Sequence, residues 1–142
     1  MRKGAVPVAQ QVLSEELKKV LDGKVFVAVA TIQPDGSPQV SPVWVKRDGE
    51  DLLISTTVDR RKTRNMRRDP RVTVLVHPAE APYTYAELRG TASLTTEGGQ
   101  ELIDELAHKY VGKSYAEFNP ASDQDAERVV VRVGVDKVVG RL

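Results

Sequence analysis

The stretch TTVDRRKTRNMRRDPR, residues 56–71, decides what this chain can fold into and what it can hold. Seven cations and one carboxylate, Asp69, lie between Arg60 and Arg71, so this part of the stretch carries a charge of +6. The whole chain carries only +1, which leaves the remainder at −5. A basic cluster this dense in an otherwise acidic protein indicates a binding site for an anion.

The same stretch predicts a short helix over residues 60–69. Residue types that cap helix N-termini precede it at Thr56, Thr57 and Asp59. Pro70 ends it, because proline disfavours helical geometry in the residue before it.

Cations occupy the first turn of this predicted helix, at Arg60, Arg61 and Lys62. They oppose the helix dipole, which favours negative charge at that end. A phosphate group bound to the free N–H groups of the first turn would remove the conflict. A solvated basic surface, or ion pairs with the acidic remainder, is the alternative explanation.

Strand patterns dominate the rest of the chain, and turn signals at residues 34–37 and 47–50 predict that the first three strands form a meander. Pro42 predicts an edge or a bulge, and Gly90 a bulge or tight bend. Amphipathic helices are expected at residues 12–21 and 97–111, and a loop anchored by Tyr115 and Phe118 is expected at residues 114–124. The six predicted strands span residues 25–32, 39–46, 51–57, 72–76, 83–94 and 127–139. This order favours a mainly β fold with short helices, a small closed or split barrel, over a sandwich or a parallel sheet.

Length and composition are those of one soluble globular domain spanning residues 1–142. The absence of cysteine excludes disulfides, zinc–thiolate sites and cysteine nucleophiles. The first residues, MRKGAVPVAQQ, lack the apolar segment of an export signal, and no run reaches membrane-spanning length. A cytoplasmic protein without membrane contact is therefore expected.

Other catalytic patterns are weak. The two histidines, His77 and His108, are expected to be structural, so no metal site is predicted. No G-x-S-x-G, G-x-G-x-x-G or Walker pattern is present. The aromatic residues Trp44, Tyr83 and Tyr85 either stack on a planar ligand or serve ordinary packing, and the sequence leaves both open.

Three segments together resemble a known family: ATIQPDGSPQVSPV at residues 30–43, ISTTVDRRKTRNMRRDPRV at 54–72 and YAELRGTA at 85–92. They are similar to the flavin/deazaflavin oxidoreductases with the pyridoxamine-5′-phosphate-oxidase-like split barrel. The most similar members are actinobacterial proteins that use the deazaflavin coenzyme F420. The resemblance implies a six-stranded antiparallel split β-barrel of the FMN-binding type, and a homodimer with cofactor sites at its interface.

The resemblance also implies which residues bind the cofactor. The helix start and the preceding strand end would hold its phosphate, the segment at 38–43 would run beside its ring, and aromatic side chains would line the pocket, some from the partner subunit. These cofactor-binding residues are Pro38, Gln39, Val40, Ser41, Val43, Ser55, Thr56, Thr57, Arg60, Arg61, Lys62, Asn65, Tyr83 and Tyr85. We further expect Arg61, Arg64 and Arg68 to face the acidic polyglutamate tail that F420 carries and FMN lacks.

The function implied is hydride transfer from reduced F420 to a small electron-poor organic molecule. No catalytic side chain is identified, and either Tyr85 or solvent could supply the proton. The alternatives are an FMN-dependent oxidase or reductase on the same fold, a non-catalytic F420 carrier, and a nucleic-acid binder. The near-neutral charge of the whole chain and the lack of a nucleic-acid motif argue against the last.

Overall fold

The protein was analysed as a computed structural model, which describes residues 12–121 and 126–142. The loop predicted at 114–124 is wrong for residues 115–118, which form a short helix, and residues 122–124 lie outside the described residues. The helices are α1 Glu15–Asp22, α2 Arg61–Arg68, α3 Gly99–Val111 and α4 Tyr115–Phe118. The strands are β1 Val27–Ile32, β2 Pro38–Val43, β3 Lys46–Asp48, β4 Asp51–Thr57, β5 Arg71–Val76, β6 Ala86–Thr95 and β7 Arg128–Gly140.

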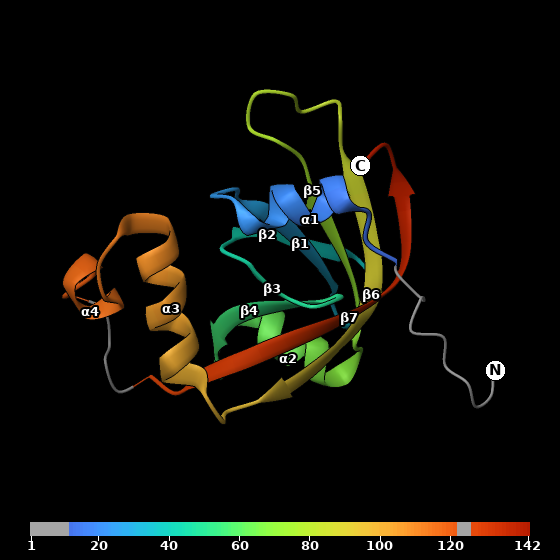
Figure 1. Ribbon diagram of the computed structural model, residues 1–142. Coiled ribbons are helices and arrows are strands. Elements are labelled where there is room, and N and C mark those ends of the chain that lie inside the picture. The colour runs from blue at the N-terminus through green and yellow to red at the C-terminus, as the bar shows by residue number, and fades with distance from the viewer. Residues whose placement is uncertain (1–11, 122–125) are drawn as a thin grey trace, which may run out of the picture.

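Within the described residues, the strands form one curled antiparallel sheet in the order β2-β1-β5-β6-β7-β4-β3. The sheet is not closed, because β2 and β3 lie at its two ends and do not pair with each other. In Figure 1, α3 and α4 stand beside the sheet next to β4, whereas α1 and α2 lie at different ends of it. The predicted mainly β split barrel is confirmed.

The predicted meander of three strands is wrong. The segment at 39–46 divides into β2 and β3, because Trp44 and Val45 belong to neither strand. β2 pairs only with β1, while β4 pairs with β3 and with β7. The chain thus crosses from one end of the sheet to the other between two consecutive strands, and the predicted six strands become seven.

The predictions made for Pro42 and Gly90 are confirmed. Pro42 lies in β2, which is an edge strand, so its missing N–H removes no sheet hydrogen bond. Gly90 lies at a shift in the pairing register between β6 and β7, as a bulge requires. The extra residue of this bulge is Asp136 on β7, which lies between the partners of Arg89 and Gly90.

The hydrophobic core is aliphatic. Its members are leucines, valines, alanines, Ile54 and Met66, and none of the seven aromatic residues belongs to it. Helix α1 contributes Leu17 and Leu21, both fully buried, and burying a leucine contributes about 1.5–3 kcal/mol. No helix in residues 12–121 and 126–142 is both long enough and apolar enough to cross a membrane.

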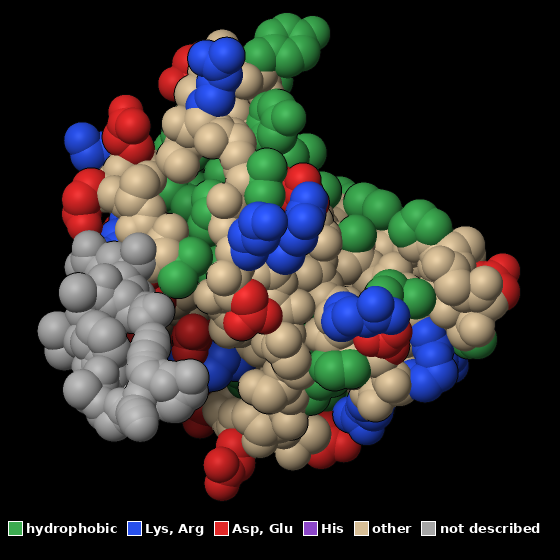
Figure 2. Space-filling model, turned by 90° about the vertical axis from the view of Figure 1, so that its right-hand side faces the viewer, with side chains coloured by type: hydrophobic (Ala, Val, Ile, Leu, Met, Phe, Trp, Pro, Cys, Tyr) green, Lys and Arg blue, Asp and Glu red, His purple; other side chains and the backbone are tan. Residues whose placement is uncertain are grey.

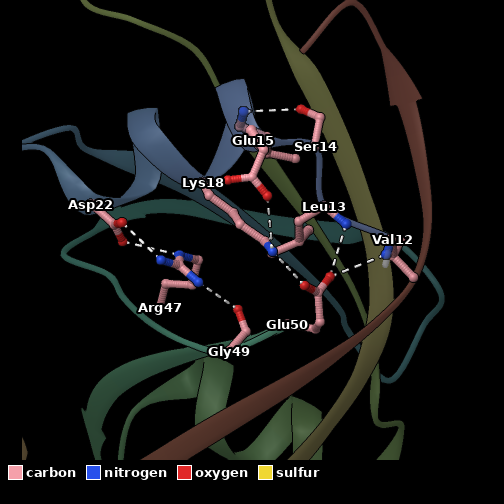
Figure 3. Close-up of polar contacts among 10 residues, drawn as sticks. Val12, Leu13, Ser14, Glu15, Lys18, Asp22, Arg47, Gly49 and Glu50 are labelled. Atoms are coloured by element: carbon pink, nitrogen blue, oxygen red, sulfur yellow. Dashed lines mark hydrogen bonds and ion pairs between the residues drawn. The ribbon is translucent and has the colours of Figure 1, made fainter. Parts of the chain in front are cut away.

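Glu50, in the turn between β3 and β4, fixes the entry to α1 (Figure 3). Its carboxylate accepts hydrogen bonds from the backbone N–H groups of Val12 and Leu13 at 3.1 and 3.0 Å, and it pairs with Lys18 at 2.8 Å. Partial burial opposes ionisation, but these donors outweigh it, so the pKa of Glu50 lies below its usual value. The ionised carboxylate therefore holds α1 against the β3–β4 turn.

Glu50→Gln is expected to lower the free energy of unfolding by about 1 kcal/mol at pH 7, a value discounted for solvent screening. Because folding lowers the pKa of this group, its contribution is present above the ordinary glutamate pKa of about 4.3 and is lost as the pH falls through the folded value. Urea unfolding of both proteins between pH 7 and pH 3 checks this. A difference that persists unchanged at the acidic end would contradict the assignment.

Candidate functional site

The basic helix begins without a side-chain cap. Arg60 occupies the N-cap position of α2, and its side chain makes no capping hydrogen bond. Asp59, which the sequence offered as a cap, instead accepts a hydrogen bond from the Thr57 hydroxyl at 2.8 Å. The amide groups of the first turn are therefore not satisfied by a protein side chain at the cap, as anion binding requires.

Thr63 joins this helix to the end of β4. Its hydroxyl donates to the Thr57 carbonyl at 2.6 Å and lies 3.0 Å from the Thr56 hydroxyl. All three threonines are buried. Of the predicted cofactor residues, Thr56 thus positions α2 through its hydroxyl and Thr57 through its backbone carbonyl.

A cavity of about 290 Å³ opens beside the start of α2. Its walls come from β2, β4, α2, α3, α4 and β7, together with the residue before β1 and the connection after β2. It is lined by Phe26, Pro42, Val43, Trp44, Ser55, Arg60, Lys62, Ile103, Leu106, Tyr115, Phe118 and Arg128. No carboxylate lines this cavity among the described residues.

Three of the lining residues are cations. Lys62 is only 8% exposed, and its ammonium donates to the Ser41 hydroxyl at 3.0 Å. Burial, and after it the nearby Arg60, lowers the pKa of Lys62. Arg128 lies 3.5 Å from the Ser55 hydroxyl and 4.7 Å from the centre of the Tyr115 ring. Positive charge is thus concentrated here without a carboxylate in the described lining.

Aromatic rings form the other part of the cavity wall. Trp44 stacks on Tyr110 with ring centres 5.2 Å apart and planes 10° apart. The ring centre of Phe118 lies 5.5 Å from that of Trp44. The Tyr115 ring contacts Trp44 edge-on, with ring centres 6.4 Å apart. Phe26 extends the cluster from Tyr110 at 5.9 Å. Four of the chain's seven aromatic residues therefore line the cavity, Tyr110 stacks on one of them, and none of the five belongs to the core.

The other cations of the basic stretch differ in their surroundings. Arg71 pairs with Asp69 at 2.7 Å, which lowers the pKa of that carboxyl to about 2. Arg68 donates to the Ile32 carbonyl, so it is tied to the end of β1. Arg61 and Arg64 are exposed and form no ion pair with residues 12–121 or 126–142. Within the described chain, Arg71 is thus the only cation of the stretch that a carboxylate neutralises.

Asn65 does not line the cavity. It is fully buried, and its amide donates to the Thr31 hydroxyl at 3.0 Å and to the Gln33 side chain at 3.2 Å. Its Oδ1 is buried without a partner in the described residues. Gln39 accepts from the same Thr31 hydroxyl at 2.7 Å. The predicted cofactor residues Asn65 and Gln39 therefore form a network that attaches α2 to the β1–β2 hairpin.

The structure brings part of the predicted site together. Five predicted residues line the cavity or contact its lining: Ser41, Val43, Ser55, Arg60 and Lys62. Pro38 and Val40 are exposed on the edge strand, and Tyr83 and Tyr85 lie before β6 on the projecting β5–β6 connection (Figure 1). Contacts of these four residues with a larger ligand or with a second copy of the chain stay predictions.

Sequence reasoning missed Arg128 and treated Tyr115 and Phe118 only as anchors of a loop. Arg128 reaches the site because β7 pairs with β4, which sets it opposite Thr57. No local pattern indicates that pairing. The signal available for Tyr115 and Phe118 was their aromatic character in a polar segment, where ordinary packing does not require it.

The opposite side of the molecule is different in character. On the face turned away from α3 and α4, cations and carboxylates are interspersed with hydrophobic side chains (Figure 2). No group of three or more potential metal ligands occurs within residues 12–121 and 126–142.

Comparison with known proteins gives a consistent result. The sequence profile described as pyridoxamine 5′-phosphate oxidase matches residues 13–141. An F420 reductase of known structure is 30% identical, with a TM-score of 0.78 over 89% of this chain and 98% of that one. The conserved protein Rv2991 from Mycobacterium tuberculosis is 28% identical, with a TM-score of 0.70 over 92% of this chain and 85% of that one. General Stress Protein 26 from Bacillus anthracis, 17% identical with a TM-score of 0.64 over 87% of this chain and 89% of that one, shares the fold. The chain belongs to the pyridoxamine 5′-phosphate oxidase family of split-barrel, flavin-type oxidoreductases.

Proposed function

We propose that this protein is an F420-dependent reductase, which transfers a hydride from reduced F420 to a small electron-poor organic molecule. The observation that carries the proposal is the cavity itself. One part of its lining holds Arg60, Lys62 and Arg128, and another part is a cluster of aromatic rings. A ligand with an anionic group and a planar ring system complements both parts.

The residues present fit such a cofactor. Arg60, Lys62 and the free amide groups at the start of α2 would hold its phosphate group. Trp44 and its aromatic neighbours would face its ring, with Val43 and Pro42 on the β2 side. When bound, F420 supplies hydride chemistry, and the protein supplies binding, orientation and the electrostatic environment. The apolar side chains Ile103 and Leu106 would exclude water from the ring.

The choice of F420 over FMN rests on two further features. The 30% identical neighbour is an F420 reductase. Arg61 and Arg64 are exposed near the proposed phosphate site and form no ion pair within the described chain, so they are available for the acidic polyglutamate tail. FMN, which lacks that tail, is the second candidate, because the family as a whole binds flavin-type cofactors.

We also propose that the protein is a homodimer and that a second copy completes the cofactor site. Large hydrophobic side chains are exposed around the cavity and on the adjoining edge strand: Phe26 is 64% exposed, Val40 59% and Phe118 44%. Burial of these side chains against a second copy would give the dimer its stability. Analytical ultracentrifugation checks this proposal, and a monomer at micromolar concentration would contradict it.

Turnover is the test of the proposed function. Chemically reduced F420 is mixed with the protein and with conjugated carbonyls, quinones, tetrapyrroles and nitroaromatic compounds, and the return of the oxidised cofactor's absorption is followed. The expected result is oxidation that depends on both protein and acceptor. Tight F420 binding without turnover for any acceptor would instead support a carrier.

The pH dependence of cofactor affinity is expected to report Lys62. Its ammonium binds an anion only while it is protonated, and burial lowers its pKa in the free protein. Affinity should therefore fall as the pH rises through that lowered pKa. In the Lys62→Arg variant, the guanidinium stays charged across this pH range. The F420 affinity of this variant, whether higher or lower than that of the wild-type protein, should therefore not fall with pH in this way. Identical pH profiles for the two proteins would contradict the assignment.

A further inference from the structure

The two residues between β2 and β3, Trp44 and Val45, have no strand partner. β2 ends at Val43 and β3 begins at Lys46. The Val45 residue is completely buried. No neighbouring strand pairs with its backbone N–H and C=O groups, because it lies between β2 and β3. Buried backbone groups of this kind must find other partners.

Side chains from α3 supply both partners. The Tyr110 hydroxyl accepts a hydrogen bond from the Val45 N–H at 3.1 Å and donates to the Val25 carbonyl at 2.6 Å. The Lys109 ammonium donates to the Val45 carbonyl at 2.7 Å and to the Leu21 carbonyl at the end of α1 at 2.8 Å. Two consecutive residues of one helix therefore satisfy the backbone of Val45 on both sides.

The same tyrosine also holds the indole ring of Trp44. Its ring lies parallel to Trp44 at 5.2 Å, and Trp44 forms part of the cavity wall. The hydroxyl of Tyr110 fixes the backbone of one residue and its ring packs against the side chain of the residue before it. Tyr110 thus contacts both the backbone of Val45 and the side chain of Trp44.

Two ion pairs extend the attachment on the β3 side. Lys46 contacts Glu105 of α3 at 2.5 Å, and Arg47 binds Asp22 of α1 through two hydrogen bonds at 3.0 and 2.9 Å (Figure 3). These pairs are partly exposed and contribute little stability individually. The contacts of Lys109 and Tyr110 are partly buried and reach the connection itself.

We propose that Tyr110 and Lys109 are positioning residues, which set the orientation of Trp44 and thereby the shape of the cofactor cavity. This proposal rests on the proposed function, since it assigns Trp44 to the wall against which the cofactor ring binds. Without these two side chains, the unpaired connection between β2 and β3 would be free to shift, and the indole would move with it.

Intrinsic fluorescence tests the proposal directly, because Trp44 is the only tryptophan in the chain. Tyr110→Phe keeps the stacked ring and removes both hydrogen bonds. We expect its Trp44 to be more accessible to acrylamide in the folded, cofactor-free protein, and its affinity for F420 to be about tenfold weaker. Lys109→Met should shift both measurements in the same direction. Circular dichroism establishes that each variant is folded.

Lys113→Met is the matched control, because it makes the same chemical change at an exposed lysine just beyond α3. It should leave both measurements unchanged. Folded Tyr110→Phe and Lys109→Met variants that differ only in melting temperature, with wild-type quenching and wild-type affinity, would overturn the proposal. Failure of the wild-type protein to bind F420 would contradict the proposed function alone, since quenching is measured on the free protein.

Discussion

Replacing both Arg60 and Lys62 with alanine is expected to weaken F420 binding by about 2–4 kcal/mol, which is ~30-fold to ~1000-fold. These two cations line the cavity at the start of α2, and Lys62 is almost completely buried. A hydrogen bond to a charged group contributes about 1.5–3 kcal/mol, and two neighbouring groups on one phosphate do not add fully. Isothermal titration calorimetry at fixed ionic strength measures the change.

The control removes the same charge elsewhere. Arg67 lies on the part of α2 that borders β6 instead of the cavity, and Lys137 is exposed on β7. Arg67→Ala combined with Lys137→Ala should change the affinity by much less than the first pair, because only general attraction is lost. Equal affinities of the Arg60/Lys62 double variant and the wild-type protein would refute the assignment of the phosphate site.

Gly90→Ala should lower the free energy of unfolding by about 3 kcal/mol, the upper part of the range for overpacked sites. A Cβ atom at this position would lie 2.3 Å from the Gly134 carbonyl oxygen and 3.0 Å from a methyl group of Val133. The close atom belongs to the backbone of β7, so it cannot rotate away. Relief requires the β6–β7 pairing to open at the bulge. Chemical denaturation measures the loss.

Gly134 provides the matched control, because it lies on β7 opposite Thr91, the residue after Gly90. The nearest atoms to a Cβ added there are 4.0 Å away, which is ordinary contact distance. Gly134→Ala should therefore be neutral or stabilise by up to about 1 kcal/mol through the lower entropy of the unfolded chain. A similar loss of stability in both variants would show that the bulge does not require glycine.

Local sequence patterns predicted the elements of this fold better than their pairing. The apolar periodicity of α3 and the bulge at Gly90 depend on neighbouring residues, and the sequence contains their signals. The pairing of β4 with β7 depends on residues far apart in the chain. The meander failed for a related reason: the break at Trp44 and Val45 is stabilised by Lys109 and Tyr110, which no local pattern connects to it.

The candidate site shows the same division. Arg60 and Lys62 could be identified because charge density and helix position are visible in the sequence. Arg128 could not, since it enters only through strand pairing. Asn65 was assigned to the cofactor by family resemblance, yet its side chain is buried in a network with Thr31 and Gln33. The predicted role of Asn65 in cofactor binding stays a prediction.

The choice of cofactor is decided by titrating the wild-type protein separately with F420 and with FMN while the emission of Trp44 is followed. Trp44 lies in the cavity wall, so a ring bound there should quench its emission in a saturable way. The expected result is saturable quenching by F420 at lower concentration than by FMN. Tighter binding of FMN, or no quenching by either compound, would contradict an F420-dependent reductase.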